Sequence, residues 1–263
     1  MDPSGLAIFT IGRMNPPTSG HLGLIKAMMT LALTLGVNKV YIILSHTKNS
    51  TKDPLRCDRK RAILVTEGMI ESLKEDDPSL SEIEVDIRCM KEHVPEECNK
   101  YNVTLQQVCN IRKDAGSPMH MILIVGADRE FSYKWIHDHL AKQGVILDTI
   151  TLDRPEGAMS ATSMRDLVLE GEEETFKAFT KANGLSEENA ASLYAELRRE
   201  LKPQVKPQGK RGKSEHPGEP LRKRERRGGK KKRTKRRKRT HKKRKIRTHK
   251  KQKRNRYSFK HQS

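Results

Sequence analysis

The sequence predicts an α/β fold, a doubly wound parallel five-stranded sheet with C-terminal helices, followed by a disordered basic tail. Two observations lead to this prediction. Between residues 6 and 201, short apolar segments alternate with longer amphipathic ones, which is typical of parallel strands joined by helices. From residue 202 onward lysine and arginine dominate, so this part cannot bury enough apolar surface to offset the entropy of ordering it.

Five segments have the composition of buried strands. The first is a short apolar run, the second is rich in β-branched residues, and the third alternates apolar with polar side chains. In order, the expected strands are residues 6–11, 39–45, 84–89, 120–125 and 144–152. Ligands of such sheets bind where the carboxyl ends of the strands meet, so we expect the site at that edge.

Seven amphipathic segments are expected to be helices. They are residues 21–35, about 58–74, 103–111, 129–142, 162–170, 173–182 and 186–201. Gly36 follows the first of them and supplies the left-handed residue that commonly ends a helix. Residues 90–118 are otherwise irregular.

The net charge of +21 is an average of two unlike parts. Residues 202–263 contain 30 Lys or Arg and 3 Glu, a net charge of +27. Residues 1–201 hold the other 24 basic residues and 30 acidic ones, a net charge of −6. We therefore expect a body at 1–201, large enough to bury one core, and a separate tail at 202–263.

The tail is nearly continuous lysine and arginine from Lys230 to Arg256, and Arg-Thr-His-Lys-Lys occurs at both 239–243 and 247–251. Such runs bind nucleic acid or act as nuclear-import signals, the alternative being a solubilising tail. We expect residues 202–263 to bind nucleic acid nonspecifically and with strong salt dependence. Similar tails occur in proteins of large DNA viruses, which makes the nucleus or the virion expected locations.

The four cysteines, Cys57, Cys89, Cys98 and Cys109, form no C-x-x-C pair. This spacing argues against zinc and against a disulfide framework, so reduced thiols are expected. The N-terminus lacks the basic and apolar regions of a secretory signal. The longest apolar run, near residues 119–125, is too short to cross a bilayer. We therefore expect a soluble intracellular protein without membrane contact.

A loop rich in glycine and proline follows the first expected strand, at the place where α/β proteins bind phosphate. Residues 12–21 read Gly-Arg-Met-Asn-Pro-Pro-Thr-Ser-Gly-His. Gly12 leaves the strand without a Cβ, and Gly20 allows a ligand to approach the backbone. Thr18 or the serine after it can cap the helix, and His21 lies where the helix dipole attracts an anion. The alternative is a turn whose histidine only caps a helix.

A second motif follows the fifth expected strand and opens a helix. Residues 159–165 read Met-Ser-Ala-Thr-Ser-Met-Arg. Ser160 or Thr162 can cap that helix, which leaves backbone N–H groups and hydroxyls for phosphate oxygens. Arg165 returns to the face of Thr162 one turn later, and its planar fork suits phosphate. An ordinary cap followed by a surface arginine is the alternative.

Together the two motifs resemble the signatures of the nucleotidylyltransferase superfamily, in the branch where threonine replaces the first histidine of H-x-G-H. The second motif is similar to I-S-S-T-x-x-R, with Ala161 where the second serine is usual, so one hydroxyl contact is missing. The first motif is closest to proteins like nicotinamide mononucleotide adenylyltransferase, followed by cytidylyltransferase-like proteins. The resemblance implies that residues 1–201 form a catalytic domain with the Rossmann-like fold of that superfamily.

The resemblance also implies a role for each motif residue. His21 would donate to the α-phosphate region, and the β- and γ-phosphates would be held by Thr18, Ser160, Thr162 and Arg165. The catalytic residues would be His21, Thr18 and Arg165. Gly126 and Asp128 resemble the family's G-x-D turn beside the base or ribose, although Asp128 can instead cap a helix. The nucleotide-binding residues would be Gly12, Arg13, Gly20, Gly126, Asp128, Ser160 and Thr162.

The segment after the second expected strand looks like the acceptor-binding stretch of viral and phage nucleotidylyltransferase-like proteins. It reads Ser-His-Thr-Lys-Asn-Ser-Thr-Lys-Asp-Pro-Leu from residue 45, and a solvated charge run is the alternative. Trp135 falls on a later helix with Phe131, and it can stack on a base or nicotinamide ring, although a core position is favoured. The candidate acceptor contacts are Lys52, Lys60, Arg61 and Trp135.

The chemistry implied by the resemblance is attack of an acceptor phosphate oxygen on the α-phosphorus of a nucleoside triphosphate, with release of pyrophosphate. Because that oxygen is already anionic, catalysis requires positioning and charge stabilisation rather than a protein nucleophile. Mg²⁺ bridging phosphate oxygens is the expected cofactor and needs few protein ligands. We assign no protein metal ligands, since the histidines lack suitable spacing.

The substrates are expected to be ATP and nicotinamide mononucleotide, giving NAD. CTP with glycerol phosphate or phosphocholine is the second expectation, and a coenzyme A or flavin precursor the third. A noncatalytic nucleic-acid-binding protein on this scaffold is an alternative of another class, against which the retained His21, Thr162 and Arg165 argue. A homo-oligomer remains an open alternative for the assembly.

Overall fold

The computed structural model describes residues 5–46, 51–154 and 157–201. The chain divides into two units, Met1–Pro207 and Gln208–Ser263, and the description below concerns the first. The predictions of a disordered tail and of nucleic-acid binding fall on residues 202–263, which lie outside the described residues.

Five strands form one parallel sheet in the order β3-β2-β1-β4-β5, so the fold-class prediction is confirmed. The strands are β1 (Leu6–Gly12), β2 (Lys39–Leu44), β3 (Glu84–Cys89), β4 (His120–Gly126) and β5 (Ile146–Leu152). The order runs outward from β1 in one direction and from β4 in the other, as in Rossmann-like folds. The switch point between β1 and β4 is where such sheets bind ligands.

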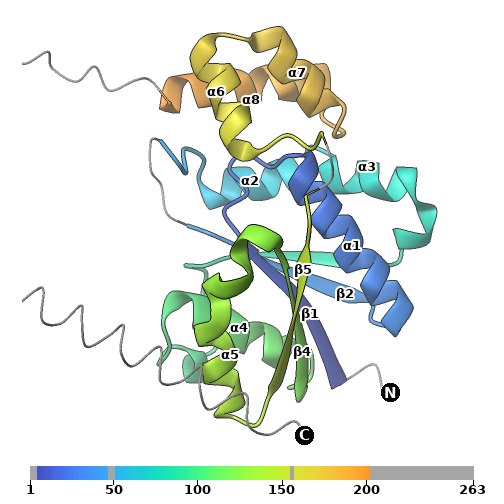
Figure 1. The fold of residues 1–263 in the computed structure, drawn as a ribbon, viewed down its shortest axis with the longest axis vertical. Coiled ribbons are helices and arrows are strands. Elements are labelled where there is room, and N and C mark those ends of the chain that lie inside the picture. The colour runs from blue at the N-terminus through green and yellow to red at the C-terminus, as the bar shows by residue number, and fades with distance from the viewer. Residues whose placement is uncertain (1–4, 47–50, 155–156, 202–263) are drawn as a thin grey trace, which may run out of the picture. The chain divides into compact units, whose positions relative to one another are not determined.

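The described part of the chain contains eight α-helices. They are α1 (Ser19–Leu35), α2 (Cys57–Leu64), α3 (Met69–Asp76), α4 (Val103–Asp114), α5 (Lys134–Ala141), α6 (Ala161–Glu170), α7 (Glu173–Lys181) and α8 (Glu187–Glu200). Of these, α1–α5 flank the sheet and α6–α8 pack together beyond its end (Figure 1). Short 3-10 helices are η2 (Pro78–Leu80), η3 (Glu96–Cys98) and η4 (Ala127–Tyr133). Among these described helices, none combines the length and the apolar character needed to span a bilayer.

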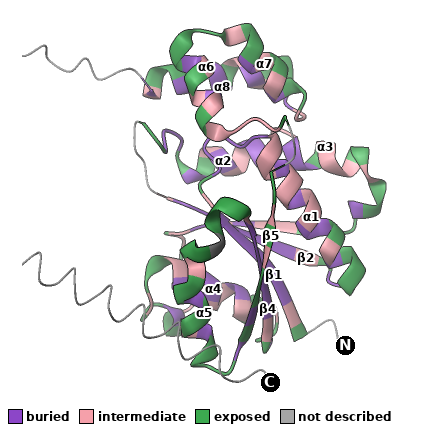
Figure 2. Cartoon of the chain, viewed as in Figure 1, coloured by how far each residue is buried: buried purple, intermediate pink, exposed green. Residues whose placement is uncertain are grey.

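The sheet separates two hydrophobic cores. Successive side chains of a strand face opposite sides, so Ile8 of β1 joins one core, and Ala7 and Phe9 join the other. The first core packs against α1, α2, α3 and the C-terminal helices, and the second against α4 and α5. Figures 1 and 2 show α4 and α5 together on one side of a largely buried sheet. Burial on both faces explains why the central strands are almost uniformly apolar.

Two predicted helices differ from the structure. The helix expected over 58–74 is two helices, α2 and α3, separated at Gly68, whose φ of 98° suits glycine far better than other residues. The helix expected over 129–142 starts as η4 and becomes α-helical only at Lys134. Because Ile136 and Leu140 face the sheet, Trp135 stays 40% exposed, so the favoured core position for Trp135 was wrong.

The expectation of reduced thiols was also wrong. Cys57 at the start of α2 is bonded to Cys89 at the end of β3, and Cys98 of η3 is bonded to Cys109 of α4. The partners are 32 and 11 residues apart in the sequence, so only the fold brings them together. Stable disulfides are typical of oxidising environments, and the cysteines therefore give no support to the expected intracellular location.

Candidate functional site

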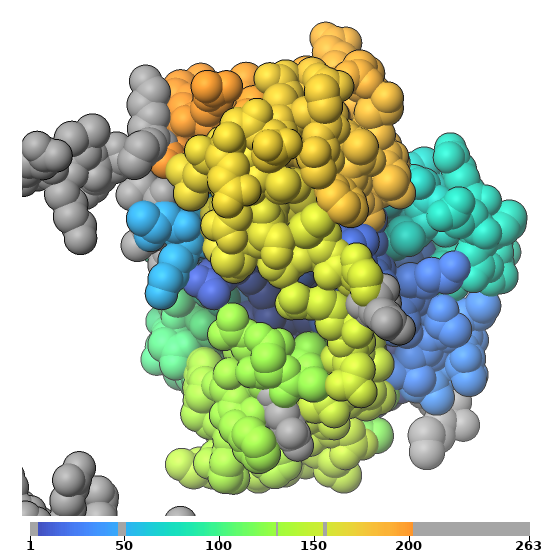
Figure 3. Space-filling model, turned by 45° about the horizontal axis from the view of Figure 1, so that its top comes forward, coloured from blue at the N-terminus to red at the C-terminus, as the bar shows by residue number. Residues whose placement is uncertain are grey.

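A cleft of about 900 Å³ opens at the carboxyl edge of the sheet. Its lining comes from the ends of β1, β4 and β5, the segment after β2, and the first turns of α1 and α6. Figure 3 shows the surface hollowed between the green segment of η4 and α5 and the yellow segment that leads into α6. The cleft lies at the edge of the sheet where the site was expected, and its volume suits a ligand of cofactor size.

The loop after β1 is a packed structure. Residues 14–18 are all buried, whereas Arg13 is exposed within the cleft. Met14 adopts a φ of 44°, and the peptide bond between Asn15 and Pro16 is cis. Two consecutive prolines further restrict the backbone of this segment. The loop therefore presents its backbone and Arg13 to the cleft from a firmly packed base.

Asn15 ties this loop to the segment that precedes α2. Its side-chain Nδ2 donates to the Leu55 carbonyl at 2.9 Å, and its Oδ1 accepts from the Leu55 N–H at 3.1 Å. The same amide also donates to the carboxylate of Asp53. Because Asn15 is only 1% exposed, these contacts fix the loop from within the protein.

His21 lies in the first turn of α1 and lines the cleft. The expected side-chain cap is absent, because Thr18 uses its hydroxyl on His21 instead: Thr18 Oγ1 lies 2.9 Å from Nδ1 of the imidazole. If the threonine O–H donates to Nδ1, the proton of the neutral ring is on Nε2. In that tautomer Nε2 is a hydrogen-bond donor.

The imidazole of His21 is neutral at neutral pH. The pKa of His21 is lowered to about 4, mainly by burial and next by the nearby charge of Arg154. The carboxylate of Asp128 acts in the opposite direction and only partly offsets these effects. A neutral imidazole can donate a hydrogen bond without transferring a proton. An anion bound in the cleft would raise this pKa, because it favours the charged ring.

We expect this pKa to make folding stability depend on pH. As pH falls from 6.5 to about 4, the unfolded chain takes up a proton at His21 and the folded chain does not. The free energy of unfolding therefore decreases across this window. Denaturant unfolding of the wild type and of His21→Gln at several pH values tests this: the difference in stability between them should shift against the wild type as pH falls. A difference that stays constant from pH 7 to 4 would contradict the assignment.

The second motif reaches the first across the cleft. Ser160 caps α6, its Oγ accepting from the Ser163 N–H at 2.9 Å. Arg165 donates from Nη1 to the Asn15 carbonyl at 2.6 Å and from Nη2 to Thr162 Oγ1 at 3.1 Å. In addition, the backbone N–H of Met159 donates to Ser19 Oγ at 3.1 Å. Segments about 150 residues apart thus form one continuous surface.

Positive charge gathers along the cleft although residues 1–201 are acidic overall. The cationic residues that line it are Lys52, Arg13, Arg129, Arg154 and Arg165. The pKa of Arg165 is lowered, mainly by burial and to a lesser extent by the charge of Arg13. An anion between the two guanidinium groups would relieve that repulsion. The cleft is therefore suited to a polyanionic ligand.

The turn after β4 contributes the far wall. A Cβ built on Gly126 would lie 3.0 Å from Asp128 Oδ1, so the turn is compact around its glycine. Asp128 lies inside η4 and does not cap it, since Gly126 occupies the N-cap position. Its carboxylate pairs with Arg129 at 3.3 Å. Both predicted turn residues line the cleft.

The structure separates the four candidate acceptor contacts. Lys52 lines the cleft, whereas Lys60, Arg61 and Trp135 do not. Lys60 is fully buried, Arg61 pairs with Glu92, and the indole of Trp135 donates to the Ser132 carbonyl at 3.2 Å. All other candidate residues line the cleft: Gly12, Arg13, Thr18, Gly20, His21, Gly126, Asp128, Ser160, Thr162 and Arg165.

Three residues that the sequence analysis gave no role also shape the cleft. Asn15 anchors the first loop, and Tyr133 donates from its hydroxyl to the Ile11 carbonyl at 3.0 Å. Arg154 lies close enough to His21 to lower its pKa. The position of Arg154 two residues after the end of β5 was a usable signal, because residues at that edge of the sheet border the site.

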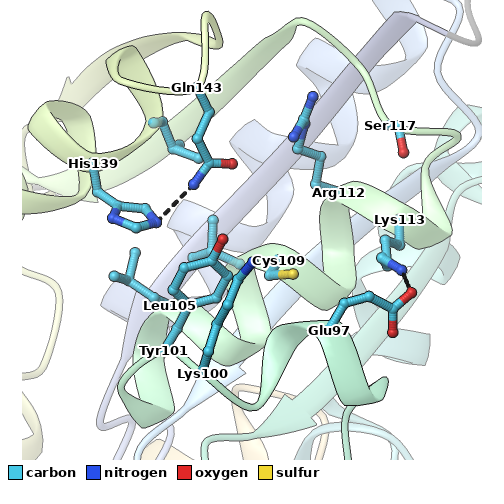
Figure 4. Close-up of a pocket in the computed structure, with 12 residues that line it drawn as sticks. Glu97, Lys100, Tyr101, Leu105, Cys109, Arg112, Lys113, Ser117, His139 and Gln143 are labelled. Carbon is cyan, nitrogen blue, oxygen red and sulfur yellow. Dashed lines mark hydrogen bonds and ion pairs between the residues drawn. The ribbon is translucent and has the colours of Figure 1, made fainter.

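A smaller cavity of about 190 Å³ lies between α4 and α5 (Figure 4). Its basic Lys113 is paired with Glu97, and His139 lies 2.8 Å from the Gln143 amide. Neither motif contributes to its lining. It is smaller than most ligand sites, so the large cleft is the candidate site.

No protein-family model matches the chain, and no curated protein sequence matches it. Among solved structures, it is similar to Plasmodium falciparum nicotinic acid mononucleotide adenylyltransferase complexed with APC. The TM-score is 0.38 and the identity 9%, over 62% of this chain and 84% of that one.

Proposed function

We propose that the protein is a nucleotidylyltransferase, which transfers a nucleoside monophosphate from a nucleoside triphosphate to a phosphate-bearing acceptor. The observation that carries the proposal is the hydrogen bond from Arg165 to the Asn15 carbonyl. This contact joins the two motifs on one cationic cleft that also holds His21. A single phosphate-binding loop occurs in many kinds of protein. Two such motifs around one cleft are suited to binding a polyphosphate chain at both of its ends.

The reaction forms a bond between an acceptor phosphate oxygen and the α-phosphorus as the bond to pyrophosphate breaks. The leaving pyrophosphate takes the electron pair, and no proton needs to move. We assign Nε2 of His21 as the donor to an α-phosphate oxygen, where negative charge develops. Thr18 orients the ring. We assign Arg165, Ser160 and Thr162 to the β- and γ-phosphates, and Arg13 to the same end of the ligand.

Mg²⁺ fits this cleft as a companion of the nucleotide. The carboxylates that line the cleft are Asp128 and Asp153, and the described residues contain no group of three or more metal-binding side chains. Mg²⁺ is commonly bound by one or two carboxylates together with substrate phosphates and water. When bound, it would neutralise charge on the triphosphate. The two aspartates, which the sequence did not suggest as metal ligands, are its candidate protein ligands.

ATP and nicotinamide mononucleotide are the substrates we propose first, on the resemblance of the first motif. CTP with a phospho-alcohol is the second pair. The test is pyrophosphate release with each nucleoside triphosphate and each acceptor in turn. One pair should give release that requires both substrates, and no release with any pair would contradict the proposal.

For residues 202–263 we propose nucleic-acid binding, on their net charge of +27. We expect the full chain to bind duplex DNA with log Kobs falling by about 0.9 per phosphate neutralised as log salt rises. Residues 1–201, with a net charge of −6, should not bind. Fluorescence anisotropy of labelled DNA at several salt concentrations measures both. Affinity that is unchanged on removal of residues 202–263 would contradict the proposal.

A further inference from the structure

We infer that Lys60, which does not reach the cleft, is a positioning residue for Arg165: it neutralises Asp53, so that Asp53 orients Asn15 without capturing the guanidinium. The inference rests on the proposed function, because Arg165 matters here as a phosphate ligand. Lys60 was a candidate acceptor contact on sequence grounds, and the structure assigns it to a different task.

Lys60 and Asp53 form a buried ion pair. Lys60 is 0% exposed and Asp53 1% exposed. The ammonium Nζ lies 3.2 Å from Asp53 Oδ1 and donates to the Ser45 carbonyl at 2.7 Å. Ser45 in turn donates from its hydroxyl to Asp53 Oδ2 at 2.8 Å. Each charge of this pair is compensated by the other, as buried ions require.

Asn15 connects this ion pair to the cleft. The side-chain amide of Asn15 donates to Asp53 Oδ1, and the backbone carbonyl of the same Asn15 accepts from Arg165 Nη1. The orientation of the Asn15 peptide therefore determines where the guanidinium lies. The guanidinium of Arg165 is thus positioned by a buried network of Lys60, Asp53 and Asn15.

The charges of Asp53 and Arg165 attract each other. Burial and the charge of Arg13 lower the pKa of Arg165. The carboxylate of Asp53 has a smaller effect in the opposite direction, so Asp53 attracts the guanidinium electrostatically. Without Lys60, the buried carboxylate would lose the ammonium at 3.2 Å, and Arg165 is bonded to the residue that Asp53 already contacts. Loss of a buried ion-pair partner is costly, so the guanidinium would turn toward Asp53 and away from phosphate.

The test compares Lys60→Met, Asp53→Asn and the double variant in the full chain. Binding of ATP and of inorganic tripolyphosphate is measured by calorimetry. Lys60→Met should weaken both by about tenfold or more, the scale of one lost charge-assisted hydrogen bond. Asp53→Asn retains an oxygen for Asn15 and removes the charge that would compete for Arg165, but it leaves the buried Lys60 ammonium without its carboxylate. Its affinity should therefore fall clearly less than that of Lys60→Met. The double variant should recover most of the affinity lost in Lys60→Met.

Lys39→Met is the matched control. Lys39 bonds Asp114 at 3.2 Å, at the opposite end of β2 from the cleft. Its loss should lower thermal stability without changing affinity for tripolyphosphate. This control separates a specific effect on Arg165 from a general loss of folded protein.

A crystal structure of each variant decides the inference independently of ligand binding. In Lys60→Met, the Arg165 guanidinium should lie against Asp53, and in Asp53→Asn it should remain on the Asn15 carbonyl. An unmoved guanidinium in Lys60→Met, or equal loss of affinity in both single variants, would overturn the inference. If Lys60→Met does not fold, Asp53→Asn and the double variant still decide it, since displacement of Arg165 in either contradicts the charge argument. A wild type that binds no triphosphate would overturn the proposed function instead.

Discussion

Replacing His21 by alanine should lower kcat by about 10²–10³-fold, the scale of one lost hydrogen-bond donor to the transition state. The neutral imidazole, with a pKa of about 4, presents one N–H where negative charge develops during transfer. Because this contact strengthens as charge develops, the loss should fall mainly on kcat, with a smaller change in KM. Steady-state pyrophosphate release measures both constants.

Thr18→Val is the control for this prediction. It removes the hydroxyl that lies 2.9 Å from Nδ1 of His21 and keeps the shape of a buried side chain. We expect a smaller decrease in kcat than for His21→Ala, because the ring remains and only its orientation is loosened. Circular dichroism and thermal melting check that both variants are folded. Near-normal turnover in folded His21→Ala would refute the role of the imidazole.

Replacing Arg165 by alanine should lower kcat/KM by about 10²-fold, since charge-assisted hydrogen bonds contribute roughly 1.5–3 kcal/mol each. Lysine should not restore it. The guanidinium bonds the Asn15 carbonyl and Thr162 at the same time, and a single ammonium cannot reproduce that fork. Weaker binding of the triphosphate should appear as a higher KM for the nucleotide, with the KM for the acceptor nearly unchanged.

Arg199→Ala is a suitable control for Arg165, because Arg199 is a 70% exposed arginine on α8. It should leave all kinetic constants unchanged. If Arg165→Lys were as active as the wild type, the requirement for a planar, two-sided donor would be wrong. An equal rise in both KM values would place Arg165 outside the triphosphate end of the cleft.

Local patterns were sufficient to predict the sheet and much of the cleft. The central strands β1, β2 and β4 are buried on both faces, so their apolar runs are visible in the sequence, as in residues 120–125. The glycine and proline content of residues 12–21 likewise predicts a turn between the first strand and the first helix, and the structure has one there. These features depend on short-range chemistry, which the sequence carries directly.

Features that depend on distant partners could not be predicted in the same way. A lysine near the start of a helix normally remains solvated, and Lys60 is buried only because Asp53 and Ser45 compensate its ammonium. The disulfide partners lie on different elements. Likewise, Trp135 resembles a core residue until the sheet-facing positions of α5 are known.

The most direct test of nucleotidylyl transfer follows each phosphate of the nucleotide separately. Parallel reactions contain nucleoside triphosphate labelled with ³²P at the α- or the γ-position, together with the acceptor that supports pyrophosphate release. The proposed mechanism predicts α-label in the acceptor product and γ-label in pyrophosphate, with both signals strongly reduced in His21→Ala. Transfer of γ-label to the acceptor, or α-label found only in free nucleoside monophosphate, would contradict it.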